Sequence, residues 1–127
     1  MNFIPTDKFD FDSCSNLFRT SDNEVILHRD ELLYWLQDYN WPVAPLVEKR
    51  LLRVADQMVD SVILILQGHD EIWKYWILSS FLTQVEISVL KKINPELKRI
   101  SIEPTKSEIS EGLHVKANIL LDKLNSE

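Results

Sequence analysis

Hydrophobic residues recur at three- and four-residue spacing along most of the chain, the pattern of helices that are buried on one side. Asp10 or Asp12 is expected to cap a short first helix near the N-terminus. A stripe of leucines predicts a second helix over residues 24–37. Pro42 suits the first turn of a third helix, over residues 43–54, because a helix leaves its first amides without partners. On that third helix Glu48, Lys49, Arg50 and Arg53 are expected to face water.

The second half repeats this pattern. Residues 57–67 are apolar nearly all round, which predicts a helix at the centre of the fold. Gly68 is expected to end that helix, and Asp70 to cap the next one by accepting the amide of Ile72 or Trp73. We expect these helices to share a buried core of nine residues: Leu36, Val47, Val62, Ile63, Leu66, Ile77, Phe81, Leu120 and Leu121.

The last third is a weaker version of the same pattern. Pro95 is expected to restart a helix after residues 85–93, and Pro104 to end it. Thr105 and Glu108 have the spacing of a capping box, so one final helix is expected after them.

Two segments of the chain are similar to each other. Leu36–Leu52 reads LQDYNWPVAPLVEKRLL and Leu66–Leu82 reads LQGHDEIWKYWILSSFL; each contains Asp-x-x-Trp, and the two units start 32 residues apart. Such a period is typical of stacked helical pairs. The sequence predicts one all-α domain, at least 60% helical, made of about seven helices. Its expected parts are a lead-in with one short helix over 1–20, a first repeat over 24–54, a second over 57–83 and a degenerate third over 85–124.

The second unit also matches the Asp-x-x-apolar-basic pattern that opens the second helix of HEAT-like and armadillo-like repeats, through Asp70, Trp73 and Lys74. The first unit departs from it, because Pro42 stands in the basic position. The segments WLQDYNWPVAP and DEIWKYWIL, with IPTDKFD near the start, resemble an uncharacterised bacterial family of similar length. The resemblance covers nearly the whole chain. It implies a short right-handed HEAT-like or armadillo-like stack without an assigned activity.

Composition narrows the class of protein. The chain has 127 residues, 45% of them hydrophobic and 27% charged, as in an ordinary globular domain. A single cysteine, Cys14, cannot form an internal disulfide, and no signal peptide is visible, so a cytoplasmic location is expected. The longest apolar run is far shorter than the ~20 residues of a membrane helix. The net charge of −6 argues against nucleic acid and favours a basic partner.

Candidate catalytic and metal-binding groups are few. The three histidines have no metal-ligand spacing, and neither a metal nor a cofactor is expected. His69, Asp70 and Glu71 are adjacent and point in different directions from a helix start, which favours a cap and solvated charges. The alternative is a small enzyme whose acidic site combines these three residues with Asp38 from the equivalent turn.

Four tryptophans cluster in the two repeat units, at positions 35, 41, 73 and 76. Either they fill the seam between helical pairs, each indole N–H finding an acceptor, or some of them form an aromatic edge for a partner. Equivalent turns of a repeat stack lie on the same edge, so we expect Asp38, Asn40, Trp41 and Glu71 to form one contact surface for a basic protein. The sequence therefore favours a non-catalytic protein-interaction module, and its size and charge are compatible with an immunity-type inhibitor of a basic bacterial toxin.

Overall fold

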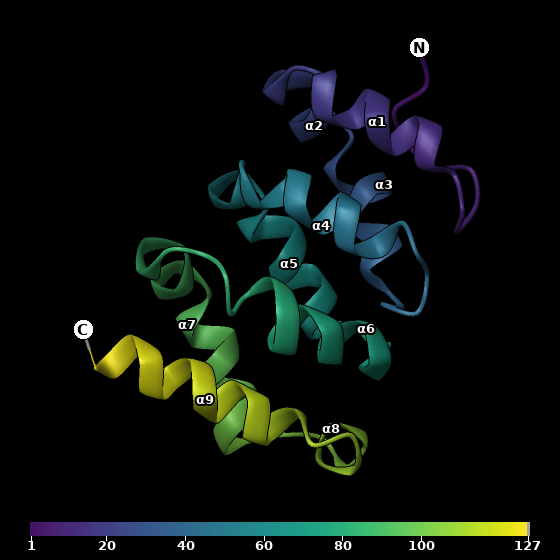
Figure 1. Cartoon of the computed structure of the whole chain (residues 1–127). Coiled ribbons are helices and arrows are strands. Elements are labelled where there is room, and N and C mark those ends of the chain that lie inside the picture. Colours follow the sequence, from purple (N-terminus) through teal and green to yellow (C-terminus); the bar gives the residue numbers. More distant parts are fainter. Residues whose placement is uncertain (127) are drawn as a thin grey trace. The chain divides into compact units, whose positions relative to one another are not determined.

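The computed structural model describes residues 1–126, and these are all-helical (Figure 1). Helices make up 71% of the chain and the described part contains no strand, which confirms the predicted all-α class. The helices within residues 1–126 are α1 (Phe11–Arg19), α2 (Asp22–Leu27), α3 (Arg29–Leu33), η1 (Tyr34–Leu36), α4 (Ala44–Leu52), η2 (Ala55–Gln57), α5 (Val59–Gln67), α6 (Glu71–Trp76), η3 (Ile77–Phe81), α7 (Ile87–Ile102), α8 (Lys106–Ser110) and α9 (Leu113–Asn125).

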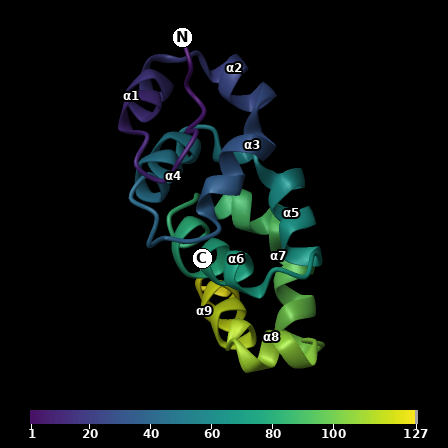
Figure 2. The same ribbon diagram turned by 90° about the vertical axis from the view of Figure 1, so that its right-hand side faces the viewer.

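The chain forms two compact units. The N-terminal unit spans Met1–Ser61 and the C-terminal unit spans Val62–Glu127, so α5 begins in the first and continues into the second. Within the N-terminal unit α1 and α3 pack on α4 (Figures 1 and 2). Within the C-terminal unit α7 packs along α9, which runs back in the opposite direction, and α6, η3 and α8 also contact α9 (Figure 2).

The first helix forms where the sequence predicts it. The Asp10 side chain accepts a hydrogen bond from the Ser13 amide at 3.1 Å, which makes Asp10 the N-cap of α1. The next helix starts at Asp22, two residues before the predicted residue 24, because Ser21 caps it by accepting the Glu24 amide. A local side chain that satisfies an orphan amide thus decides each start.

The helix predicted over residues 24–37 is broken into α2, α3 and the 3-10 turn η1. His28 separates the first two, with backbone angles outside the helical region. The Arg29 guanidinium donates to the Ile26 carbonyl at 3.0 Å and, through Nε, to the Ser61 hydroxyl at 3.2 Å. Arg29 therefore binds a carbonyl that a continuous helix would offer to the amide of residue 30.

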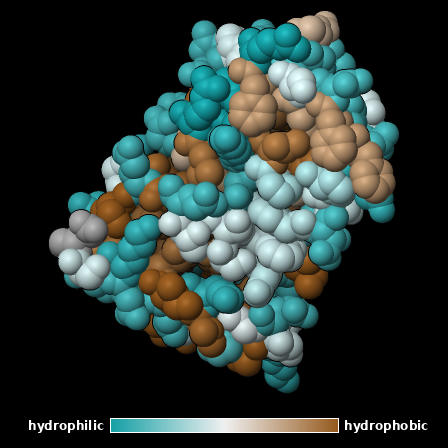
Figure 3. Space-filling model, in the orientation of Figure 1, coloured by the Kyte–Doolittle hydropathy of each residue, from teal (hydrophilic) through white to brown (hydrophobic). Residues whose placement is uncertain are grey.

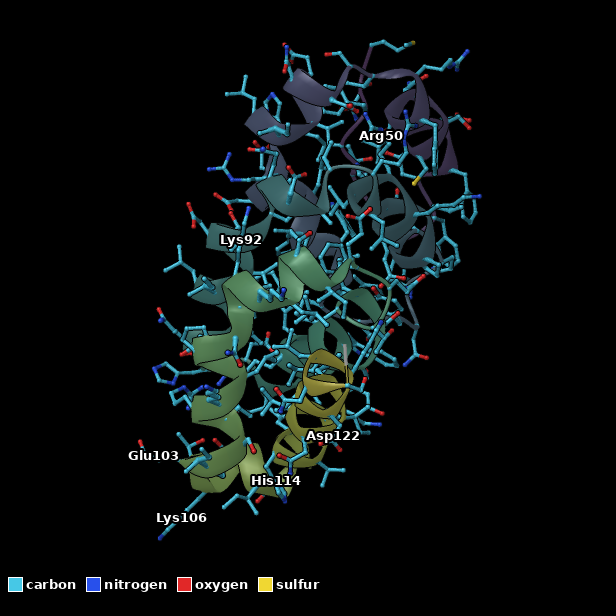
Figure 4. The ribbon with its side chains drawn as sticks, turned by 90° about the vertical axis from the view of Figure 1, so that its left-hand side faces the viewer. Arg50, Lys92, Glu103, Lys106, His114 and Asp122 are labelled. Atoms are coloured by element: carbon cyan, nitrogen blue, oxygen red, sulfur yellow. The ribbon has the colours of Figure 1, made fainter. Side chains whose placement is uncertain are left out.

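The α4 helix corrects two predictions. It starts at Ala44 with Pro45 in its first turn, so Pro42 lies in the preceding turn. Arg50 was expected to face water but is fully buried. Its position is labelled in Figure 4. Its guanidinium donates to the carbonyls of Leu17 and Thr20 and to the Asp22 carboxylate at 2.6 Å, while its Nη1 has no hydrogen-bond partner within residues 1–126. Arg50 thus joins α4 to the end of α1 and the start of α2.

The C-terminal unit departs from prediction at two of its helix boundaries. Pro95 lies inside the continuous helix α7, because the apolar face on both sides of it stays in register and is buried: Val89, Leu90, Ile93, Leu97 and Ile100. The single helix expected at the end is split into α8 and α9. Gly112 separates them with φ +70°, a left-handed conformation that favours glycine.

Seven of the nine predicted core residues are buried, and Ile63 and Leu121 are only half-buried. The helix α5 is apolar nearly all round but is not buried on every side, because Leu64 is 68% exposed. A sequence pattern that is apolar on every face does not say which face meets solvent. Hydrophobic atoms also reach the surface along α9, where Val115 and Ile119 are 50% and 54% exposed (Figure 3).

A π-helical turn follows α6 directly. In η3 the Leu82 amide donates to the Ile77 carbonyl, five residues back, at 2.9 Å. The Ser79 hydroxyl donates to the Tyr75 carbonyl at 2.6 Å, which is the acceptor that a regular helix would offer to an amide. This competition accounts for the wider turn at a place where the apolar periodicity predicts ordinary helix.

Candidate functional site

The first candidate surface is the turn between η1 and α4 in the N-terminal unit. Three of the predicted contact residues, Asp38, Asn40 and Trp41, lie in this turn. Asp38 accepts the Asn40 amide at 2.8 Å through its carboxylate, and its carbonyl accepts the Trp41 amide at 3.1 Å. Asn40 is exposed, whereas Asp38 and Trp41 are half-buried. Short-range hydrogen bonds therefore fix the backbone of the turn.

Three aromatic rings gather beside this turn. The rings of Trp35 and Trp41 meet edge to face with centroids 5.4 Å apart, and Tyr34 lies 5.4 Å from Trp35 and 6.2 Å from Trp41. Tyr34 is 49% exposed and the two indoles are half-buried. We call this group, together with Asp38 and Asn40, the aromatic turn. Its tryptophans are neither fully in the core nor fully on the surface, and the role of a partner contact stays a prediction.

The turn is also fastened to the helix that follows it. The Tyr39 hydroxyl donates to the Glu48 carboxylate, which lies on α4 and is 7% exposed. Glu48 was expected to face water, and its burial is a correction. A buried carboxylate that accepts a hydroxyl hydrogen bond holds the turn against the helix.

The fourth predicted contact residue, Glu71, belongs to the C-terminal unit. Its side chain is 13% exposed and forms an ion pair with Lys74 at 2.8 Å within α6. The other carboxylate oxygen accepts the Ser107 hydroxyl at 3.0 Å. Much of its charge is thus engaged inside the unit. That Glu71 shares one edge with the aromatic turn stays a prediction.

Lys74 leads from Glu71 to a buried carboxylate. Lys74 is 2% exposed, and its ammonium group donates to Glu108 at 3.0 Å. Glu108 is fully buried, and both of its oxygens accept from the Arg99 guanidinium, at 2.9 and 2.8 Å. Arg99 in turn pairs with Glu96 at 3.1 Å. We call these five side chains (Glu71, Lys74, Glu96, Arg99 and Glu108) the Glu108 network; they join α6, α7 and α8.

The capping box predicted from Thr105 and Glu108 holds one end of this network in place. The Thr105 hydroxyl accepts the Glu108 amide at 3.2 Å, and the Glu108 carboxylate accepts the Thr105 amide at 2.8 Å. Burial alone would raise the pKa of Glu108. Hydrogen bonds from Arg99, the Thr105 amide and Lys74 outweigh burial and hold this pKa at about 2. Glu108 therefore stays ionised at every physiological pH.

A pocket of about 490 Å³ lies over the Glu108 network and is lined by all five of its side chains. Its remaining walls are Gln67 at the end of α5, the following Gly68, the exposed His69, and Thr105 and Ser107. This volume is within the range of sites that bind small molecules or single side chains. Sequence reasoning found Glu71 and His69 but missed the pocket, because three of its other charges, Glu96, Arg99 and Glu108, come from a distant part of the sequence.

The structure shows different uses for the residues of the alternative acidic enzyme site. Asp70 is the N-cap of α6 and accepts the Trp73 amide at 3.0 Å, the bond that the sequence predicts. Glu71 is paired with Lys74, and Asp38 lies in the other unit. The Trp73 indole nitrogen is buried and has no hydrogen-bond partner in the part of the chain that the structure describes, contrary to the expectation that each indole finds an acceptor. Its half-buried ring places it between the two predicted roles.

Comparison with known proteins gives a family and no activity. Among residues 1–126 no three His, Cys, Asp or Glu side chains are grouped as metal ligands, and no helix there is long and apolar enough to cross a membrane. No curated protein matches the chain. A family model described as "Domain of unknown function (DUF5071)" matches residues 3–121. The match covers nearly the whole sequence, so the chain belongs to this uncharacterised family.

Proposed function

We propose that this protein is a non-catalytic protein-interaction module that binds a basic protein partner through the aromatic turn. The observation that carries the proposal is the partly exposed cluster of Tyr34, Trp35 and Trp41 beside Asp38. Trp and Tyr are enriched among the few residues that contribute most of the binding energy of protein interfaces. A short turn fixed by its own hydrogen bonds loses little entropy on binding.

Charge supports a basic partner. Residues 1–61 contain eleven acidic and six basic side chains, which is where most of the net charge of −6 resides. Two of those basic side chains are engaged inside the unit, Arg50 with Asp22 and Arg29 with a carbonyl and a hydroxyl. An acidic surface increases the rate of encounter with a cationic protein. An immunity-type inhibitor of a basic toxin is one protein of this kind.

The proposal also includes two finer statements. We infer that the helical pairs are arranged as HEAT-like or armadillo-like repeats, on the strength of the two Asp-x-x-Trp units 32 residues apart. We infer a cytoplasmic location from the single buried cysteine and the absence of internal disulfides. Small-angle scattering that fits a compact, unstacked pair of units would contradict the repeat arrangement.

The test is a quantitative capture experiment with matched variants. Wild-type protein immobilised at low density is exposed to an extract of its native cells, and captured proteins are quantified by mass spectrometry. A basic protein captured by wild type should be captured at least tenfold less by Trp41→Ala, because the truncation removes the centre of the aromatic cluster. With that protein purified, surface plasmon resonance should show slower association for Asp38→Lys and a flatter salt dependence.

Asp56→Lys is the matched control. Asp56 is an exposed carboxylate of the same unit, in η2 beyond the other end of α4, and its reversal changes the net charge by the same amount. If Asp38→Lys and Asp56→Lys slow association equally, only overall charge matters and the aromatic turn is not the site. If Trp41→Ala remains folded by circular dichroism and captures the same proteins as wild type, the proposal is wrong.

A further inference from the structure

The five side chains of the Glu108 network leave more hydrogen-bond acceptors than donors for a ligand in their pocket. Glu108 accepts four hydrogen bonds, two of them from Arg99, so its lone pairs are used. Arg99 also donates to Glu96 and to the Leu66 carbonyl at 3.2 Å, which leaves one of its five N–H groups. Lys74 donates two of its three N–H groups, to Glu71 and Glu108.

The carboxylates of Glu71 and Glu96 accept fewer hydrogen bonds than that of Glu108. Glu71 accepts one bond at each oxygen, from Lys74 and from Ser107. Among the described residues, Glu96 accepts only from the Arg99 Nε, shared between its two oxygens at 3.1 and 3.3 Å. A carboxylate offers about four lone-pair positions. Both carboxylates line the pocket and can accept further donors there.

The net charge of the pocket also favours a ligand that donates hydrogen bonds. Three carboxylates against one ammonium and one guanidinium leave the Glu108 network with an excess of one negative charge. The last residues of α5, Gln67 and the following Gly68, add the carbonyl end of a helix to the wall. That end carries partial negative charge. An anion would meet this field and would have to compete with Glu108 for the same N–H groups.

We propose that this pocket binds a cationic group with several N–H donors, a guanidinium or a primary ammonium, held between the carboxylates of Glu71 and Glu96. A guanidinium matches carboxylates with paired, planar hydrogen bonds, so it should bind more tightly than an ammonium. The group comes either from an arginine or lysine side chain of a protein or from a free small amine. The inference does not rest on the aromatic turn, which belongs to the other unit.

The first experiment uses the unmodified protein and NMR titration of its backbone amides. The probes are agmatine, Nα-acetyl-arginine amide, its neutral isostere Nα-acetyl-citrulline amide, and inorganic phosphate. Agmatine and the arginine amide should shift the amide signals of residues 67–69 and 105–107 along one saturable curve. Citrulline amide should bind at least tenfold more weakly, because it has the shape of arginine without its charge. Equal binding of citrulline and arginine amides, or saturation by phosphate instead, overturns the proposal.

The second experiment compares variants by calorimetry with agmatine. Glu96→Gln and Glu71→Gln each remove one carboxylate charge and should weaken binding at least fivefold. Asp122→Asn removes the same charge from an exposed position on α9 that does not line the pocket (Figure 4), and should change affinity less than twofold. Equal losses in all three variants would show that net charge alone attracts the probe, and would refute the site.

Two further experiments are needed. One distinguishes the two sources of the cation, and the other tests this proposal independently of the proposed function. An alanine peptide with one central arginine that binds at least tenfold tighter than agmatine identifies a protein side chain as the ligand, and the reverse order identifies a free amine. Asp38→Lys should leave the agmatine titration unchanged. Loss of the partner in that variant therefore tests the aromatic turn alone, and loss of agmatine binding in Glu96→Gln tests the pocket alone.

Discussion

Replacing Glu108 by Gln should reveal how much the Glu108 network stabilises the C-terminal unit. Glu108 is fully buried and accepts bonds from Lys74, Arg99 and Thr105. Glutamine has nearly the same shape but is neutral. Its amide nitrogen would face N–H donors and could not accept hydrogen bonds from them. Two cations would be left with one carboxylate fewer, so we expect the free energy of unfolding to fall by about 3–5 kcal/mol. Urea unfolding at pH 7 measures this loss.

The pH dependence gives a second measure of the same interaction. The pKa of Glu108 is about 2 in the folded protein, against 4.5 for an ordinary glutamate. Each pH unit between the two values corresponds to about 1.36 kcal/mol, so ionised Glu108 contributes about 3 kcal/mol at neutral pH. Because the folded pKa is the lower one, this contribution is present above about pH 5 and is lost as pH falls toward 2. The stability difference between wild type and Glu108→Gln should therefore shrink over that interval.

The test needs a control variant and must account for a second carboxylate with a low pKa. Glu103→Gln removes the same charge from an exposed position at the end of α7 (Figure 4) and should change stability by less than about 0.5 kcal/mol. The pKa of Asp10 is also about 2, because the Ser13 hydroxyl and the amides of Thr6 and Ser13 donate to it. Wild type and variant both contain Asp10, so its titration cancels in the difference. A difference that stays constant from pH 7 to pH 2.5 would refute the assignment to Glu108.

Three further predictions address the core, a helix cap and the cysteine. Phe81→Ala should lower the free energy of unfolding by about 3–5 kcal/mol, because Phe81 is fully buried, whereas Ile63→Ala should cost less; urea melts that rank them the other way would contradict the described core. Asp70→Ala should cost about 1 kcal/mol and Asp70→Asn little, since Asn also caps helices, and equal thermal shifts would show that charge matters instead. Burial, aided by the charge of Asp10, raises the pKa of the Cys14 thiol to about 11, so iodoacetamide should label it at pH 7.5 only after unfolding.

Features that depend on neighbouring residues could be predicted from the sequence. The caps at Asp10 and Asp70 and the capping box of Thr105 and Glu108 all join residues three apart, and each occurs as predicted. The helical class follows from periodicity alone. These signals are local because an orphan amide at a helix start donates its hydrogen bond to a side chain that the neighbouring sequence brings close.

Features that depend on distant partners could not be predicted. Arg50 has the pattern of a solvent-facing residue, and its burial depends on acceptors 28 to 33 residues earlier in the chain. Lys74 is buried because Glu108 lies 34 residues later. A charged residue at an outward helical position is normally solvated. Its burial can be predicted only when the group that pairs with it is known. The pocket is missed for the same reason, since its walls come from three separate stretches of sequence.

Glu71 illustrates how the structure changes the choice of substitution that the sequence alone would suggest. From sequence alone it is an exposed rim carboxylate, and Glu71→Lys would be expected to slow partner binding while leaving the melting temperature nearly unchanged. In the structure Glu71 is 13% exposed and bonded to Lys74, so the same substitution places two ammonium groups together and removes a charged hydrogen bond worth roughly 1.5–3 kcal/mol. Its melting temperature should therefore fall. A loss of binding in Glu71→Lys would then have two causes. Glu71→Gln also loses one of the two oxygen acceptors, but it keeps the other and places no second ammonium group beside Lys74, so it disturbs the unit less. The neutral substitution is the one that separates recognition from stability at this position.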